Sequence, residues 1–278
     1  MHHGAVSSRG RWLVAGLATA LLAGGVVAGA GLIDWGRPGT FQKPDGCVLT
    51  ALVLSVELDP DQAGHAVTIA AVAAREGLPP HAVTIALATA LQESKLRNLD
   101  YGDRDSVGLF QQRPSQGWGS PEQIQDPRYA AARFYRALAR VRGWQTLPVA
   151  EAAQRVQRSA DGSAYAPWEQ QARAMAVATT GQAAAGVACR YRQPAGDPAR
   201  LAAQVQIDFG PHALDRPVSP PARGWAIAGY LVAHAPRYRL TQVSYLGRTW
   251  SATAGRWSTA GSADGVVRFS SAPAPSPG

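Results

Sequence analysis

The sequence predicts a mainly α-helical domain with a short β element, followed by a small α/β domain, behind an N-terminal transmembrane helix. Three observations support this fold class. An uncharged run covers residues 12–33, apolar side chains recur at helical spacing between residues 59 and 141, and helix-like segments precede strand-like ones after residue 198. A chain of 278 residues has room for one domain of about 150 residues and one smaller unit.

The amino terminus predicts export of most of the chain. Residues 12–33 carry no charged side chain, and about 20 apolar residues suffice to cross a bilayer. Arg9 and Arg11 precede the run, which favours a cytoplasmic N-terminus and a single-pass protein whose bulk lies outside the cell membrane. The alternative is a secreted protein with a cleaved signal, because Ala28-Gly29-Ala30 fits a small-residue cleavage site.

Start and stop signals place the helices of the first domain. Asp59-Pro60 reads as an N-cap followed by proline, and residues 62–76 carry apolar side chains on one face. Pro79-Pro80 opens the next helix, and Asp126-Pro127 repeats the start signal before another apolar periodic segment. Between residues 47 and 57 apolar side chains alternate loosely, which predicts a short strand or hairpin.

The most informative segment is the second of these helices. Residues 84–92 are apolar on nearly every side, which is the pattern of a helix buried in a core. Glu93 follows at the carboxyl end, where the backbone carbonyls and apolar neighbours disfavour its ionised form. A carboxyl group that keeps its proton can serve as a general acid. The alternative is a solvated Glu at a frayed helix end, near Lys95.

A polar segment, residues 106–112, follows an acidic loop at residues 100–105. Gly108 would let backbone come close to a sugar or to the upstream acid. Gln111 or Gln112 would offer amide donors and acceptors to hydroxyl and acetamido groups. Without that acid, the segment reads as a polar turn that enters a helix.

Gln92-Glu93-Ser94 and Gly108-Leu109-Phe110-Gln111 together resemble the first two signature motifs of the lysozyme-like lytic transglycosylases and goose-type lysozymes. Phe110 stands where the family usually has Met. The resemblance covers about residues 60–185 and implies cleavage of the β-1,4 bond between N-acetylmuramic acid and N-acetylglucosamine in peptidoglycan. It implies that Glu93 protonates the leaving glycosidic oxygen and then acts as a base. The residues that it suggests for substrate binding are Ser94, Gly108, Leu109, Phe110, Gln111, Gln112 and Tyr165.

The third motif of that family is an Ala-Tyr-Asn triplet, and its nearest counterpart here is Ala164-Tyr165-Ala166. The Asn is missing, which removes the substrate contact that the motif implies. Tyr165 is a candidate to hydrogen-bond the acid or a sugar, and a structural aromatic at a helix start is the alternative. Trp118, Trp144 and Trp168 are candidates to stack on sugar faces, although most tryptophans are core or rim residues.

Two functions follow from these motifs. In an enzyme of the resembled family one carboxyl group is enough because the substrate's own groups assist, whereas an ordinary glycosidase needs two. Asp100, Asp103 and Asp105 are the candidates for a second carboxylate in a hydrolytic version. The alternative is a non-catalytic peptidoglycan-binding or divisome-associated membrane protein with a degenerate lysozyme-like cleft, and the missing Asn is its best support.

The second domain is predicted to begin after a Pro- and Gly-bearing linker at residues 193–198. Residues 199–209 and 222–235 read as helices, and residues 240–246 and 266–269 read as strands.

Part of this domain, Gly224–Ala235 and Arg248-Thr249-Trp250, weakly resembles a small α/β domain of secreted actinobacterial wall-associated hydrolases. The nearby His212, Asp215 and His234 match no zinc-binding spacing, so no metal is expected. No cofactor motif is visible, and we expect no cofactor.

The net charge and the cysteine content limit which partners and which cellular compartment are expected. The net charge is +8 and nearly all cationic side chains are Arg, but no nucleic-acid recognition motif accompanies them. Outside a bacterial membrane such a charge attracts anionic wall polymers and lipid headgroups, beside the peptidoglycan glycan strands themselves. Cys47 and Cys189 flank the helical domain, and an even pair in an exported chain predicts a disulfide between them.

These features divide the chain into a cytoplasmic tail, a transmembrane anchor or signal, a spacer, a lysozyme-like domain, a linker, a small α/β domain and a disordered Ala- and Pro-rich tail. In that order the predicted segments are 1–11, 12–33, 34–46, 47–192, 193–198, 199–269 and 270–278.

Overall fold

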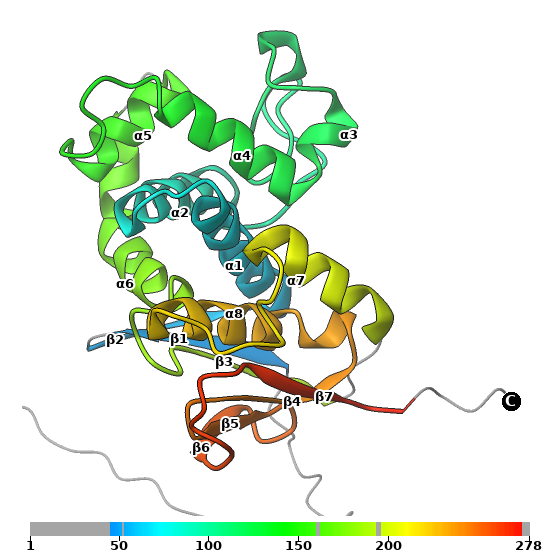
Figure 1. The fold of residues 1–278 in the computed structure, drawn as a ribbon. Coiled ribbons are helices and arrows are strands. Elements are labelled where there is room, and N and C mark those ends of the chain that lie inside the picture. The colour runs from blue at the N-terminus through cyan, green and yellow to red at the C-terminus, as the bar shows by residue number, and fades with distance from the viewer. Residues whose placement is uncertain (1–44, 52, 160–161, 193–195, 274–278) are drawn as a thin grey trace, which may run out of the picture. The chain divides into compact units, whose positions relative to one another are not determined.

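The computed structural model describes residues 45–273 except 52, 160–161 and 193–195 (Figure 1). The described residues form eight α-helices and two small antiparallel sheets, so the fold is mixed α/β. The predicted segments 1–11 and 12–33 and almost all of the spacer lie outside the described residues. No helix in the described part of the chain is long and apolar enough to cross a membrane.

The helices begin where their start signals predict. Asp59 caps α1, with its side chain and that of Gln62 forming a capping box, and prolines open α1, α2 and α4. The eight helices are α1 (Pro60–Arg75), α2 (Pro80–Ser94), α3 (Pro121–Ile124), α4 (Pro127–Leu138), α5 (Val149–Gln157), α6 (Glu169–Thr179), α7 (Leu201–Phe209) and α8 (Pro221–Ala233). Short 3₁₀ turns cover Pro114–Gln116, Gly162–Trp168, Pro198–Arg200 and Ala235–Arg237.

Helix α2 is the central helix of the first part of the fold. It packs against α1, α4, α5 and α6. Residues 82–91 are all buried, which confirms the prediction of a core helix from its nearly continuous apolar sequence. The packing fixes the direction in which the carboxyl end of α2 points, and Glu93 lies at that end.

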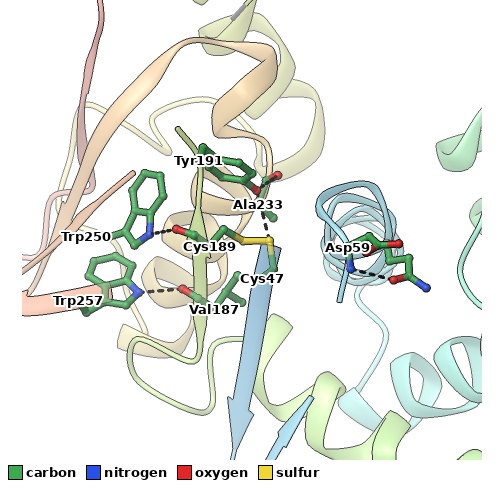
Figure 2. Close-up of a disulfide and its surroundings, with 9 residues drawn as sticks. Cys47, Asp59, Val187, Cys189, Tyr191, Ala233, Trp250 and Trp257 are labelled. Atoms are coloured by element: carbon green, nitrogen blue, oxygen red, sulfur yellow. Dashed lines mark hydrogen bonds between the residues drawn. A yellow bond between two sulfur atoms is a disulfide. The ribbon is translucent and has the colours of Figure 1, made fainter. Parts of the chain in front are cut away.

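A three-stranded antiparallel sheet contains β1 (Gly46–Ala51), β2 (Leu54–Leu58) and β3 (Val187–Arg190) in the order β2-β1-β3. The predicted hairpin between residues 47 and 57 is confirmed as β1 and β2. Cys47 and Cys189 lie directly opposite each other on β1 and β3, and their disulfide confirms the predicted pairing (Figure 2).

A second antiparallel sheet lies near the carboxyl end, in the order β6-β5-β4-β7. Strand β4 (Leu240–Tyr245) matches its prediction, whereas β7 (Arg268–Ser271) extends two residues beyond the predicted strand, into what was expected to be a disordered tail. Strands β5 (Arg248–Ser251) and β6 (Arg256–Thr259) were not predicted, because each is only four residues long and therefore shows little alternation.

The predicted boundary at residues 193–198 does not separate two cores. Residues from both sides of it belong to one hydrophobic cluster within a single compact unit, and α8 packs against α1, β3 and β4. Figure 2 shows Trp250 and Trp257 donating hydrogen bonds from their indole nitrogens to the carbonyls of Cys189 and Val187, both at 2.8 Å. The small α/β part is therefore built onto the edge strand of the first sheet.

Candidate active site

The candidate site is built around Glu93, in the last turn of α2. The Glu93 side chain is half-buried, and both of its side-chain hydrogen bonds with described residues end on the same oxygen. Tyr165 donates its hydroxyl to Oε1 of Glu93 at 2.8 Å, and Gln157 donates its side-chain amide to Oε1 at 3.1 Å. Neither of these two bonds ends on Oε2.

Tyr165 lies in the 3₁₀ turn before α6 and is buried to 1% exposure. Burial above all raises the pKa of its hydroxyl, a hydrogen bond with Ser159 opposes the shift, and the neighbouring Glu93 carboxyl adds to it. The hydroxyl is therefore protonated at neutral pH, and in this structure it donates to Glu93. The predicted hydrogen bond between Tyr165 and the acid is confirmed.

Gln157, at the end of α5, is the residue that the sequence analysis missed. Its amide nitrogen donates both to Glu93 Oε1 and to the backbone carbonyl of Phe110, the latter at 2.8 Å. Nothing in the local sequence of α5 distinguishes this Gln from a solvated one. Only the position of the apolar face of α5, which packs on α2, shows that the last residue of the helix reaches the acid.

Ser94 connects α2 to the segment that carries the second motif. It is buried, and its hydroxyl contacts the carbonyl of Ala90 in its own helix at 3.1 Å and that of Leu109 at 2.7 Å. Ser94 therefore positions the second motif against the acid. Its side chain is not free to bind a substrate in this conformation, which corrects the contact suggested by the resemblance.

The second motif also serves packing more than contact with a ligand. The side chains of Leu109 and Phe110 are fully buried, and Phe110 stacks on Phe134 with ring centroids 4.8 Å apart. Gln112 is 1% exposed and donates to the carbonyl of Ala130 at 3.1 Å. These three side chains therefore cannot contact a substrate directly, because the core surrounds them.

Gly108 and Gln111 keep other roles. Gly108 has φ +79°, and a Cβ at this position would lie 2.9 Å from the carbonyl oxygen of Ile124, so only glycine fits without a shift. Gln111 is half-buried and donates weakly to the carbonyls of Tyr101 and Gly108, both at 3.3 Å. Among the residues of this motif, Gln111 has the polar side chain that can still turn to a ligand.

Trp168 contacts Gln92 and Lys95, the residues on either side of the Glu93-Ser94 pair. Its indole nitrogen donates to Gln92 Oε1 at 2.7 Å, and the ammonium of Lys95 lies 3.9 Å from the centre of its ring. Trp144 is buried at 6% exposure, so it is not available to stack on a sugar. Trp118 is half-buried and lines a cavity at the carboxyl ends of α4 and α5.

The three aspartates proposed as second carboxylates differ in their surroundings. Asp105 accepts hydrogen bonds from the Arg113 guanidinium at 2.8 Å and from the backbone nitrogen of Ser115 at 2.7 Å. These bonds, that of Arg113 foremost, hold the pKa of Asp105 well below its usual range. Asp105 is thus a charged group that orders its own loop, whereas Asp100 and Asp103 are exposed.

No group of three or more His, Cys, Asp or Glu side chains in the described part of the chain is arranged to hold a metal ion. His212 and Asp215 pair with each other at 3.0 Å on the surface, while His234 is buried at the end of α8. The structure therefore does not bring these three residues together.

Comparison of the chain with protein-family models gave no match, and a search of curated protein sequences gave none either.

Proposed function

We propose that this protein cleaves the glycan strand of peptidoglycan, with Glu93 as the general acid and base. The observation that carries the proposal is the environment of Glu93. A tyrosine hydroxyl and a glutamine amide from two other elements both donate to one carboxyl oxygen, and neither occupies the second oxygen. The two donors lie 64 and 72 residues from Glu93 in the chain, and together they hold the carboxyl group in one orientation.

This arrangement suits the transfer of a proton from Oε2. Tyr165 and Gln157 fix the plane of the carboxyl group, so that a proton on Oε2 points in one direction. Donation of that proton to the glycosidic oxygen lets the bond between the sugar carbon and this oxygen break. The resulting carboxylate then accepts a proton from the attacking hydroxyl, which belongs to the substrate itself in a lytic reaction or to water in a hydrolytic one.

The lysozyme-like resemblance supports the same assignment at the level of motifs. Glu93 and Ser94 lie at the end of the core helix, and the Ser94 hydroxyl donates to the Leu109 carbonyl of the second motif at 2.7 Å. This chain lacks the Asn of the third motif, and Gln157 brings an amide to the acid from α5. We infer that the Gln157 side chain supplies the amide group that the missing Asn would otherwise supply near the acid.

Glu93→Gln tests the proposal. The amide keeps an acceptor for Tyr165 and Gln157 but removes the transferable proton, so we expect cleavage of purified peptidoglycan to fall at least about 100-fold. Binding to sedimented peptidoglycan should stay unchanged. Loss of turbidity and mass spectrometry of released muropeptides measure cleavage, and a lytic product lacks the one water that a hydrolytic product contains.

The control is Glu57→Gln, which removes an exposed carboxyl group on β2. It should cleave like the wild type, with circular dichroism showing that both variants are folded. Equal rates for wild type and Glu93→Gln would exclude Glu93 as the catalyst. If both proteins were folded, bound peptidoglycan and were inactive, the non-catalytic wall-binding alternative would be supported instead.

A further inference from the structure

A cavity that includes Gln157 in its lining lies at the carboxyl ends of α4 and α5. Its volume is about 350 Å³, and its walls come from the carboxyl end of α4, the carboxyl end of α5 and the loop around Trp118. This volume is at the lower end of the usual range for ligand pockets, about 300 to 1,000 Å³. It therefore has room for a small group or a short stretch of polymer.

The lining of this cavity is cationic. Five arginines line it and no Asp or Glu does; the five are Arg133, Arg136, Arg140, Arg155 and Arg158. The remaining lining residues supply backbone, the amide of Gln157 and the apolar surfaces of Trp118, Ala137, Val141 and Val156. Arg155 pairs with Glu151, and the charges of the other four arginines repel one another, so an anion that enters the hollow is favoured.

Two of the arginines are held in place by the fold. Arg133 donates from Nε to the carbonyl of Trp118 at 3.0 Å and from Nη2 to that of Gly117 at 2.6 Å. Arg155 pairs with Glu151 at 2.5 Å, one turn earlier on α5. Arg133 uses two of its nitrogens for these bonds and keeps N–H groups on the third free to donate to a ligand.

The other three cavity arginines are exposed and make no close ion pair with a described residue, although the charge of Arg136 also acts on Glu76, where it opposes the rise in pKa that burial causes. Arg136, Arg140 and Arg158 have no carboxylate within 4.0 Å among the residues that the structure describes. Each lies near the carboxyl end of α4 or α5, where a single cation would already complement the helix dipole. One cation at each helix end would be enough to complement the dipoles, so three further cations at one cavity indicate a binding site for an anion.

We propose that this cavity binds the phosphate groups of a phosphodiester polymer. The fork of an Arg guanidinium matches the oxygens of a phosphate, and such charge-assisted bonds are the strong ones. A peptide with free amino groups would bring cations into a lining that has no acidic side chain, which disfavours it. Because Gln157 lines the cavity and also donates to Glu93, a bound polymer would lie next to the candidate active site.

The test measures binding of soluble poly(glycerol phosphate) to the full-length protein in non-ionic detergent by isothermal titration calorimetry at low and physiological salt. Arg140→Gln/Arg158→Gln removes two unpaired cavity cations, and we expect the Kd to rise at least about tenfold. Arg140→Gln alone should give a smaller rise and serves if the double variant does not fold. Binding should weaken as salt increases.

The matched control is Arg248→Gln/Arg256→Gln, which removes two exposed cations on β5 and β6, outside the cavity lining. It should change the Kd less than about twofold. Equal weakening by both double variants would show a general effect of surface charge and overturn the proposal. It would also be overturned if vesicles of phosphatidylglycerol, or muropeptides that carry only carboxylates, bound more tightly than the polymer and with the same dependence on Arg140 and Arg158.

Discussion

At the scale of single residues, the site depends on which oxygen of Glu93 is held. Both donors, the Tyr165 hydroxyl and the Gln157 amide, meet Oε1. Burial raises the pKa of Tyr165, and its protonated hydroxyl donates to the acid. In the proposed reaction Tyr165 is a positioning residue, since the proton that moves is the one on Glu93.

Tyr165→Phe should therefore lower kcat more than it raises KM. The variant loses one donor to the acid but keeps the ring, so we expect kcat on peptidoglycan to fall about tenfold, as for one hydrogen bond worth about 1.4 kcal/mol, with KM changed less than about twofold. Steady-state release of muropeptides gives both constants.

Tyr135→Phe is the matched control for this change. It removes another buried phenol hydroxyl, which donates to the carbonyl of Ile69 at 3.1 Å, away from Glu93. Both variants should lose a similar amount of stability in thermal unfolding, about 1 kcal/mol. If Tyr135→Phe lowered kcat as much as Tyr165→Phe, the loss would be one of stability and the positioning role would be refuted.

At the scale of elements, the turn at residues 107–112 delivers backbone groups to the end of α2. Val107 and Gln112 form an isolated antiparallel bridge, and the Gly108 nitrogen donates to the carbonyl of Leu99 at 2.6 Å. This closes the turn so that its buried residues present carbonyls to Ser94 and Gln157. The second motif thus acts through its backbone geometry.

Gly108→Ala should show how strongly this geometry is fixed. Alanine would adopt a φ of +79° and its Cβ would meet the Ile124 carbonyl at 2.9 Å, so strain and the close contact add. We expect the free energy of unfolding to fall by about 2 to 4 kcal/mol in urea denaturation, and peptidoglycan cleavage to fall with it.

Gly143→Ala separates the cost of the backbone conformation from the cost of the contact with Ile124. Gly143 has a similar φ of +72°, but a Cβ there would have nothing within 4 Å, so only the backbone cost of about 1 kcal/mol remains. An equal loss of stability in the two variants would mean that the contact with Ile124 contributes nothing.

At the scale of the whole molecule, helices α1 and α8 join the two predicted domains through a buried polar cluster. The ring of His234 contacts the Thr68 hydroxyl at 3.1 Å, and a Cβ on Gly64 would lie only 3.2 Å from that ring. His65 contacts the carbonyl of Leu96 at 2.8 Å through Nδ1. Two buried histidines therefore lie at or near the interface that makes the described chain one unit.

The two buried histidines predict that the free energy of unfolding decreases in acid. Burial lowers the pKa of both His65 and His234, and for His234 the charges of Arg237 and Arg128 add to it. Below about pH 6.5 the unfolded chain binds protons that the folded chain does not, so stability is present above this pH and falls as the pH decreases. We expect the free energy of unfolding to drop on the order of 2 kcal/mol from pH 7.5 to pH 5.

Urea denaturation at a series of pH values measures this drop. A variant with His65→Gln and His234→Gln should lose most of it, while His212→Gln, which replaces an exposed histidine, should retain it. A pH dependence that was the same in the double variant as in the wild type would rule out the buried histidines as its source.

Much of this fold was predictable because its signals are local. Proline and Asp at helix starts, the long apolar segment of α2 and the paired cysteines each depend on neighbouring residues or on simple counting, and α1, α2, α4 and the disulfide followed them. Glu93 and its hydrogen bond with Tyr165 were found because the motif residues keep a recognisable order.

The sequence by itself determined the helices, the hairpin, the bonded cysteines and the candidate acid, because backbone geometry, burial pattern and residue type encode these within short segments. Only the tertiary structure decided which side chains surround the acid and that one core spans the predicted domains. Gln157 lies 64 residues from Glu93, and the five cavity arginines lie in α4 and α5 or just beyond their carboxyl ends, so their meeting depends on packing angles between helices. Those angles follow from side-chain fit across the whole core, which no local pattern records.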